Sequence, residues 1–320
     1  MSLKIKTKDF LETEEGLIFA VVSATLENEQ CLSFLRYVRS KTSSKWQKLD
    51  TTQANSHLKK YYPSYLYHSS VLDADLHAVP ITKIKKHHRA TKKMSDLVSS
   101  EVADNPLQVK LIQLVSLLVE NGAELDSLGV TGSFLIGAEN EKSDIDLVVY
   151  DRDAFHRTRD IFKNLIQQND LSALDQKFWE EAYQRRSPSL AFDEYVWHEK
   201  RKYNKAVFEN IKFDLSLVTD DQKQDHSNKP YKKMGDVKII AEVLDDKYAY
   251  DTPSSYSLNH PKYQSLISFT PTYTGQAFIG ETVEISGLIE GSEDSNDRRI
   301  IIGSSREAPG EYIKVVRSKN

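Results

Sequence analysis

The sequence is poor in cysteine, carries little net charge and contains no long hydrophobic run. Its one cysteine, Cys31, cannot form an internal disulfide bond or a cysteine-based zinc site, and we expect it to be a small buried side chain. The formal net charge of -4 excludes a chain that binds nucleic acid over its whole surface, so any such contact must be a local patch. The most apolar helical stretch, LIQLVSLLV, is far shorter than the ~20 residues of a membrane span.

The N-terminal sequence, MSLKIKTKDF, is charged and lacks the apolar core of a secretion signal. We therefore expect a cytoplasmic protein with no membrane partner. The chain is 39% hydrophobic and 28% charged, which is typical of a globular protein. Its 320 residues suggest two or three domains.

Three regions differ in composition, and together they predict an α+β protein. Residues 1–100 form a β-rich segment with a basic tail, and residues 101–230 read as a core of helices and strands. Residues 231–320 return to β-like runs and predict a small barrel or sandwich, for which an OB-like nucleic-acid-binding module is one alternative. The polar run 220–230, DDQKQDHSNKP, is the expected second boundary.

End signals place several elements. We expect a short helix that starts at a Thr cap, Thr51, and a longer helix that starts at Asn105-Pro106 and stops near Gly122. The stretch 192–207 also reads as helical. Short strands are expected at GLIFAVVSATL, CLSFLRYV, LGVT, IDLVVY and IKFDLSLV.

Two aspartates stand at the start of the strand IDLVVY. Residues two apart in a strand point to the same face, so Asp144 and Asp146 lie together, with Cα atoms about 6.5–7 Å apart. Ile145, Leu147 and Val149 point the other way, into a core. Two carboxylates on one face repel each other unless a positive group lies between them, and a hard divalent cation is the usual solution.

A third acid stands in the strand IKFDLSLV. Phe213, Leu215 and Leu217 would face the core, which leaves Asp214 on the opposite face. If the two strands are neighbours, the three carboxylates converge. Two metal ions held about 3.5–4 Å apart could then clamp the attacking and leaving oxygens of an in-line displacement.

The Gly-Ser pair upstream fits the same chemistry. Gly132 permits close backbone approach to an anion, and Ser133 adds a hydroxyl. The amides and dipole of a following helix would favour phosphate. Gly137 would let the chain turn back toward the aspartates.

Gly-Ser, a gap of ten residues, DIDL and a later acid in a strand resemble the nucleotidyltransferase superfamily of the DNA polymerase β type. The resemblance covers about residues 107–218, and the spacing is similar to that of small stand-alone members. The flanking β regions resemble a group of predicted archaeal nucleotidyltransferases. The resemblance implies a polymerase-β-like core, a mixed sheet with helices, between an N-terminal α/β segment and a C-terminal barrel-like domain.

The resemblance also implies roles for individual residues. Gly132 and Ser133 would hold the nucleoside triphosphate (NTP), such as ATP. Asp144 and Asp146 would bind two Mg²⁺ or Mn²⁺ ions. Asp214 would complete one metal site and help to activate the acceptor hydroxyl.

The sequence departs from the family pattern after Gly-Ser. Small members often carry basic residues there, whereas this chain has the apolar run 134–136, Phe-Leu-Ile. The phosphate charge must then be met by metals or by a basic element elsewhere. Arg201 and Lys202 are the candidates for nucleotide binding, and a solvated helix face is the alternative reading.

A basic block lies at residues 83–93, KIKKHHRATKK. Its candidates for nucleic-acid binding are Lys83, Lys85, Lys86 and Arg89. Ordinary solvated lysine surface is the alternative. RNA could therefore be a partner through this local patch.

The main hypothesis is an enzyme that moves a nucleoside monophosphate from an NTP to a hydroxyl acceptor and releases pyrophosphate. RNA, such as tRNA, and a protein side chain are both open as acceptors. One rival is a non-catalytic nucleic-acid-binding protein on the same scaffold, which the apolar run 134–136 favours. A weaker rival is a modulator that acts on a single partner protein.

Overall fold

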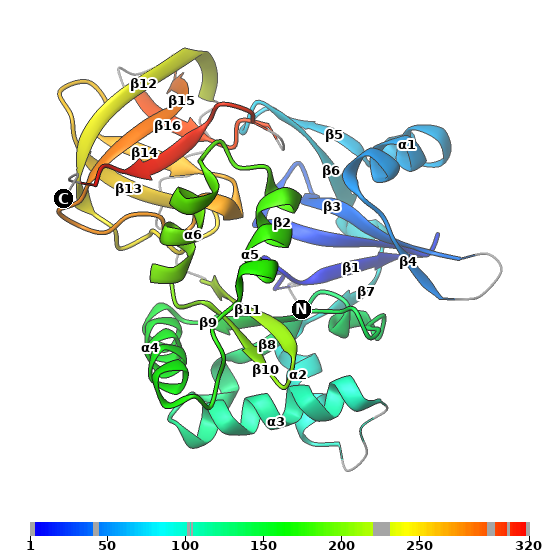
Figure 1. The fold of residues 1–320 in the computed structure, drawn as a ribbon. Helices are drawn as coiled ribbons and strands as arrows, with labels where there is room; N and C mark the ends of the chain where they lie inside the picture. The colour runs from blue at the N-terminus through cyan, green and yellow to red at the C-terminus, as the bar shows by residue number, and fades with distance from the viewer. Residues whose placement is uncertain are drawn as a thin grey trace. The chain divides into compact units, whose positions relative to one another are not determined.

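The computed structural model describes residues 4–40, 45–100, 103, 105–219, 231–292, 298–305 and 308–317, which form a mixed α+β fold (Figure 1). Two compact units make up the chain. The first comprises residues 1–69, 75–172 and 206–220, and the second comprises residues 70–74, 173–205 and 221–320. The run 220–230, expected to be a boundary, lies outside the described residues.

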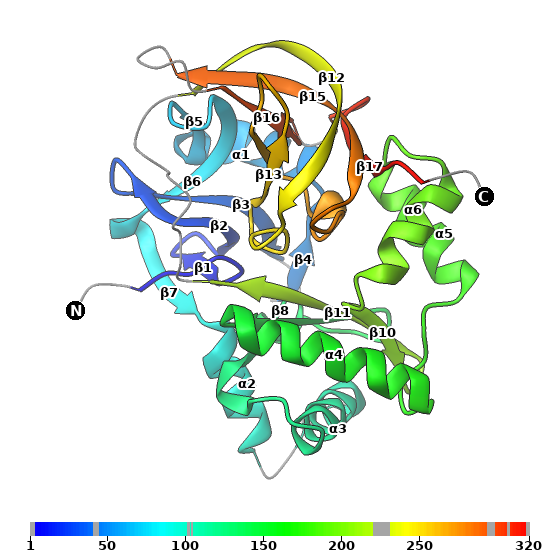
Figure 2. The ribbon, with the colours of Figure 1, turned by 90° about the vertical axis from the view of Figure 1, so that its left-hand side faces the viewer.

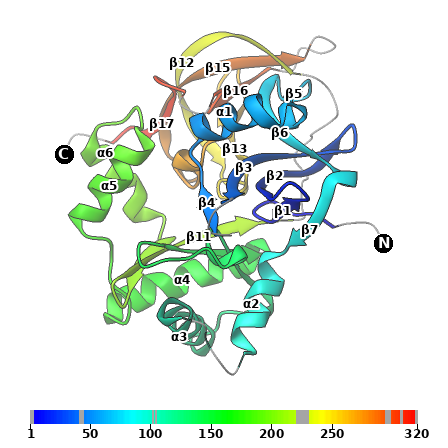
Figure 3. The ribbon, with the colours of Figure 1, turned by 90° about the vertical axis from the view of Figure 1, so that its right-hand side faces the viewer.

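The first unit contains a sheet with the strand order β5-β6-β3-β2-β1-β7, to which β4 adds along β3 (Figure 3). Its strands are β1 (Phe10–Thr13), β2 (Leu17–Glu27), β3 (Gln30–Arg39), β4 (Trp46–Lys48), β5 (Leu66–Ser69), β6 (Ala74–Pro80) and β7 (Ile84–His88). Helix α1 (Thr51–Tyr61) buries Ala54 and Leu58 against Leu35 and Phe19 of this sheet. The basic block 83–93 thus becomes an edge strand followed by a helix.

The strands β2 and β3 and the start of helix α1 can be compared with the predictions from the sequence. The predicted strands at β2 and β3 are confirmed, and Cys31 is buried on β3, where burial raises the pKa of its thiol to about 12. The expected Thr cap is wrong. The N-cap of α1 is Asp50, whose carboxylate accepts a hydrogen bond from the backbone N–H of Gln53 in a capping box. Thr51 is therefore already part of the helix.

The second sheet of the first unit has four strands in the order β10-β11-β9-β8. They are β8 (Leu128–Thr131), β9 (Ile145–Tyr150), β10 (Lys205–Phe208) and β11 (Ile211–Val218), and the helices of this unit are α2 (Ala90–Val98), α3 (Pro106–Glu120) and α4 (Arg152–Gln168). Strand β9 runs parallel to β11 and antiparallel to β8. The predicted start of α3 is confirmed, because the Asn105 side chain caps the helix by accepting a hydrogen bond from the backbone N–H of Gln108.

One face of this sheet is packed on helices, as the sequence predicts. Ile145, Leu147, Phe213 and Leu215 are each at most 1% exposed. Helix α4 contacts both β9 and β11, and Figure 2 shows it running beside β11. The centroid of its Phe162 ring lies 4.9 Å from that of the Phe213 ring. The alternation of a strand leaves Asp144, Asp146 and Asp214 on the other face.

The second unit combines helices α5 (Gln176–Arg186) and α6 (Phe192–Arg201) with six strands. The strands are β12 (Tyr231–Asp245), β13 (Ser254–Asn259), β14 (Ser265–Ser268), β15 (Thr282–Ser292), β16 (Arg298–Ile302) and β17 (Tyr312–Val315). Their order is β12-β13-β14-β16-β15-β17, and β12 also pairs with β15. The expectation that residues 192–207 are all helical is wrong: α6 ends before Tyr203, which has a left-handed φ of 47°, and Lys205–Phe208 is a strand.

Short 3₁₀ turns complete the fold. They are η1 (Pro63–Tyr65), η2 (Ile81–Lys83), η3 (Leu125–Ser127), η4 (Phe134–Ile136) and η5 (Pro271–Tyr273). Among the described residues, the helices are all too short or too polar to cross a bilayer.

Candidate functional site

The three predicted aspartates meet at one end of the four-stranded sheet. In the parallel pair β9–β11, Asp146 lies directly beside Asp214, and on the other side of β9 Thr131 lies opposite Asp146. Neighbouring strands are about 4.8 Å apart, so these side chains share one surface. We call Asp144, Asp146 and Asp214 the acidic cluster.

Gly132 packs directly against the acidic cluster. A Cβ atom at this position would lie 2.2 Å from Oδ2 of Asp146, and the backbone has a left-handed φ of +67°. Glycine is therefore needed for two reasons: a Cβ atom would collide with the Asp146 carboxylate, and other residues rarely adopt this left-handed conformation. Gly137 has a similar φ of +66° and ends η4, which confirms the expected turn back toward the aspartates.

The electrostatics of the cluster are those of crowded carboxylates. Burial is the largest cause that raises the pKa of Asp146, and the charges of Asp214 and Asp144 raise that pKa further. Oδ1 of Asp214 is buried and has no hydrogen-bond partner among the described residues. A buried carboxylate oxygen without a partner is costly, so this site calls for a cation or a proton.

Lys212 supplies one positive charge inside the cluster. Its Nζ lies 2.6 Å from Oδ2 of Asp144, and its side chain is 9% exposed, against 37% for Asp144. Lys212 stands two residues before Asp214 and therefore on the same face of β11. Lys212 was not among the residues predicted for the site, although the strand alternation that placed Asp214 on this face also places Lys212 there.

The donor set suits a hard divalent cation. Among the residues that the structure describes, no group of three or more His, Cys, Asp or Glu side chains is arranged as a ready metal site. Asp144 is held by Lys212 instead. The crowded oxygens of Asp146 and Asp214, one of them without a partner, are nevertheless the kind of ligand that Mg²⁺ prefers.

The segment after Ser133 differs from the expected helix. Residues Phe134–Ile136 form the single 3₁₀ turn η4, which is too short to supply the dipole of an α-helix N-terminus. The turn also explains the apolar run. Leu135 and Ile136 pack against a cluster that includes Phe10 and Tyr37 of the first sheet, so the missing basic residues are replaced by a packing contact.

Two lysines act on the acidic cluster, Lys8 from the turn before β1 and Lys48 from β4. The hydroxyl of Thr131 donates to the carbonyl of Lys8 at 2.6 Å, which fixes Lys8 beside the end of β8. Lys8 and Lys48 both lower the pKa of Asp146. Lys48 is exposed and lies opposite Tyr37 in the register of the antiparallel strands β3 and β4. No local signal marks these lysines in the sequence, because Lys48 and Lys8 lie 98 and 138 residues before Asp146 and reach it through packing.

Arg201 and Lys202, the predicted nucleotide contacts, belong to the second unit and have partners there. Arg201 pairs with Glu281 at 2.5 Å and stacks on the ring of Trp197 at 4.3 Å. Lys202 is 1% exposed, pairs with Glu199 at 2.5 Å and donates to the carbonyl of Thr272 at 3.0 Å. Burial lowers the pKa of Lys202 to about 8. These contacts favour a structural role over contact with a triphosphate.

The variant Lys202→Met tests this assignment. It leaves Glu199 with one of its two lysine partners, and breaking a buried pair typically costs about 3–5 kcal/mol. We expect a clear loss of thermal stability, whereas Lys200→Met, at an exposed position of α6, should unfold like the wild type. A K202M protein as stable as K200M but weaker in nucleotide binding would restore the nucleotide role.

The basic block is partly neutralised by acidic residues in and next to β1. Lys83 lies 4.0 Å from Glu15, and Lys85 lies 3.2 Å from Glu14. The two histidines also contact carboxylates: Nε2 of His87 lies 2.8 Å from Oδ2 of Asp9, and Nε2 of His88 lies 2.8 Å from Oε2 of Glu12. Lys86 and Arg89 are exposed. The contact of this block with nucleic acid stays a prediction, now with fewer uncompensated charges.

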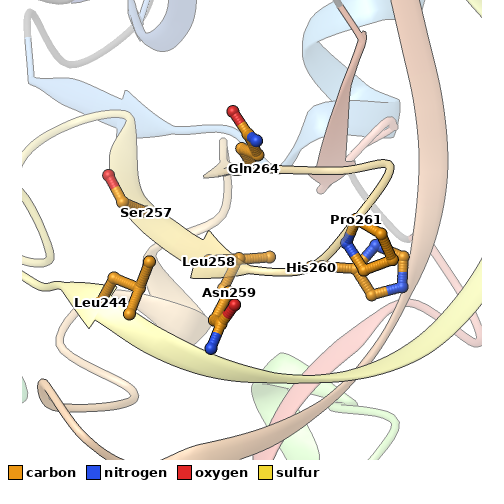
Figure 4. Close-up of a pocket in the computed structure, with 7 residues that line it drawn as sticks. All are labelled: Leu244, Ser257, Leu258, Asn259, His260, Pro261 and Gln264. Atoms are coloured by element: carbon orange, nitrogen blue, oxygen red, sulfur yellow. The ribbon is translucent and has the colours of Figure 1, made fainter.

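A separate hollow of about 570 Å³ lies in the second unit, around the turn between β13 and β14 (Figure 4). Its lining residues are Leu244, Ser257, Leu258, Asn259, His260, Pro261 and Gln264. None of them carries a carboxylate, so this hollow lacks the chemistry of the acidic cluster.

The fold and the site thus define a mixed α+β protein with a carboxylate cluster on two neighbouring parallel strands, β9 and β11. The chain is 33% identical over 340 residues to the uncharacterized protein MJ1086 of Methanocaldococcus jannaschii, in an alignment that covers 98% of this chain and 100% of that protein. It belongs to the same family as that archaeal protein. Neither a protein-family model nor a solved structure matches the chain.

Proposed function

We propose that the protein is a metal-dependent nucleotidyltransferase that moves a nucleoside monophosphate from an NTP to a hydroxyl acceptor. The observation that carries this proposal is the register of β9 and β11, which sets Asp146 beside Asp214 while Gly132 packs on the Asp146 carboxylate. Gly-Ser, an aspartate pair and a later single acid are the motif of the polymerase β type. In this chain the motif converges on one surface.

Each residue of the site would have a defined task. The acidic cluster would hold Mg²⁺ or Mn²⁺, which when bound would neutralise phosphate charge and favour in-line displacement. Gly132 and Ser133 would bring the backbone and a hydroxyl to the triphosphate. Lys8, in the turn before β1, and Lys48, on β4, act on the same carboxylate, and they would be the basic element that the apolar turn η4 does not supply.

The transfer step balances without a further reactant. The acceptor hydroxyl would give its proton to the Asp214 carboxylate, whose Oδ1 has no hydrogen-bond partner among the described residues. The acceptor oxygen bonds to the α-phosphorus while the bond from that phosphorus to the bridging oxygen breaks. The electron pair leaves with pyrophosphate. Positioning and electrostatics carry most of the rate in such a step.

The proposal includes the finer architecture. The four-stranded sheet with α3 and α4 would be a polymerase-β-like core. Each strand pairs with the next in the order β12-β13-β14-β16-β15, and β15 pairs with β12 to close the ring. Strands β14 and β16 are parallel. This closed arrangement supports a five-stranded barrel of the OB type. OB barrels bind oligonucleotides, so RNA is the acceptor class we favour, and a protein acceptor is the other outcome of the test.

The test is a transfer assay. The protein is incubated with each α-labelled NTP, with Mg²⁺ or Mn²⁺ and with total RNA or a protein extract, beside a variant that carries Asp144→Asn and Asp146→Asn. We expect metal-dependent label in one fraction, matched by pyrophosphate release and lost in the variant. Absence of label in every fraction, together with absence of metal-dependent NTP binding, would favour the non-catalytic scaffold.

A further inference from the structure

We propose that Lys212 is a positioning residue that holds Asp144 before the nucleotide arrives and then pairs with a phosphate oxygen of the nucleotide once Asp144 binds the divalent cation. This inference rests on the proposed function and assigns to that site a cation that the motif does not contain. It concerns the order in which the charges of the site change partners.

The geometry starts from the strand register. Phe213 pairs with Ile145, so one residue earlier in each strand Lys212 falls beside Asp144, as Asp214 falls beside Asp146. The four side chains therefore form two rows on one face, with a lysine in the outer row. Its Nζ lies 2.6 Å from Oδ2 of Asp144, within the range of a charge-assisted hydrogen bond.

The two members of this pair differ in exposure. The Lys212 side chain is 9% exposed, whereas that of Asp144 is 37% exposed. A buried ammonium group needs an anionic partner at all times, because an unpaired charge in such a place is strongly unfavourable. The more exposed carboxylate is the one that a cation from solvent can reach.

Metal binding then leaves the lysine without its first partner. If Asp144 held a divalent cation, its charge would be neutralised and the nearby Lys212 ammonium group would be repelled. The anion that the reaction brings to this surface is the triphosphate of the nucleotide. A lysine that is a compact point charge on a flexible stem can move from carboxylate to phosphate without a change in the backbone.

This exchange makes metal and nucleotide binding depend on each other. Without nucleotide, Lys212 competes with the metal for Asp144 and weakens metal binding. With nucleotide, the phosphate receives the lysine and the metal gains the carboxylate. Breaking a purely structural ion pair would change the stability of the protein. It would not tighten metal binding and at the same time weaken nucleotide binding.

The experiment measures Mn²⁺ binding by electron paramagnetic resonance in the absence of nucleotide, and NTP binding by calorimetry in the presence of Mn²⁺. Lys212→Met is compared with Lys212→Arg and with Asp146→Asn. We expect K212M to bind Mn²⁺ roughly tenfold more tightly and the NTP roughly tenfold more weakly than the wild type. K212R should behave like the wild type in both. If K212M fails to fold, Lys212→Gln, which removes the positive charge and keeps a polar side chain, takes its place.

The outcomes separate this inference from the function on which it rests. Mn²⁺ binding that K212M leaves unchanged or weakens, but that D146N abolishes, would overturn the role of Lys212 and leave the proposed function intact. Tighter Mn²⁺ binding by K212M with unchanged NTP affinity would contradict the exchange with phosphate. A wild-type protein that binds no Mn²⁺, or binds it as well as D146N does, would overturn both.

Discussion

Replacing Asp146 by Asn is expected to lower nucleotide transfer by roughly a thousandfold or more while the fold stays intact. Asp146 lies at the centre of the site, between Thr131 on β8 and Asp214 on β11. The substitution keeps the shape of the side chain and removes the charge that would bind metal. Asp170→Asn, at an exposed position of the same unit, is the matched control and should transfer at the wild-type rate.

The same substitution should stabilise the metal-free protein at neutral pH. Burial, Asp214 and Asp144 raise the pKa of Asp146, so the folded state binds this proton more tightly than the unfolded chain. The wild type therefore loses stability as the pH rises from the ordinary aspartate pKa of about 3.9 to the raised pKa of Asp146. D146N lacks this loss, because an amide does not ionise.

Thermal unfolding in the presence of a chelator checks the sign. D146N should melt above the wild type at pH 8, and the difference should vanish below the ordinary aspartate pKa, where the wild-type side chain is also neutral. A D146N protein that is less stable than the wild type at pH 8 would show that the Asp146 charge is favourably paired. The electrostatic description of the acidic cluster would then be wrong.

The variant Gly132→Ala is expected to lower transfer by about a hundredfold or more, the effect of displacing a reacting group by about 1 Å. The added Cβ would lie 2.2 Å from Oδ2 of Asp146, so the carboxylate must move. The left-handed backbone at φ +67° adds a loss of stability of roughly 1–2 kcal/mol. Both effects follow from one methyl group on the edge of the site.

Gly137→Ala is the matched control for this change. Gly137 has nearly the same φ, +66°, but a Cβ atom there would meet nothing within 4 Å. G137A should therefore show a similar loss of stability and keep most of the transfer activity. Equal activity of G132A and G137A would mean that the contact between Gly132 and Asp146 does not position the site.

The sequence was sufficient for the parts of the site that follow from strand alternation. The period of two placed Asp144, Asp146 and Asp214 on one face and Ile145, Leu147 and Phe213 in the core. The same reasoning would have placed Lys212. Local patterns also located β9, β11 and the start of α3, because buried strands and helix caps leave strong short-range signals.

The remaining features depend on contacts between distant segments. Lys8 and Lys48 reach the acidic cluster because the first sheet packs on η4, and this contact has no local signature. The same packing explains why an apolar run follows Gly-Ser, so the run no longer favours a non-catalytic scaffold. Lys202 looked like a solvated or phosphate-binding residue, but Glu199 and Thr272 bury it within the second unit.

The most direct test of the acidic cluster is anomalous diffraction from crystals of the protein soaked with Mn²⁺ and a non-hydrolysable NTP. We expect manganese peaks next to the carboxylates of Asp144, Asp146 and Asp214, with the triphosphate beside Gly132 and Ser133. Crystals of D146N should lack the peaks. Manganese bound elsewhere, or nucleotide bound away from the Gly-Ser turn in the wild type, would contradict the assignment of this site.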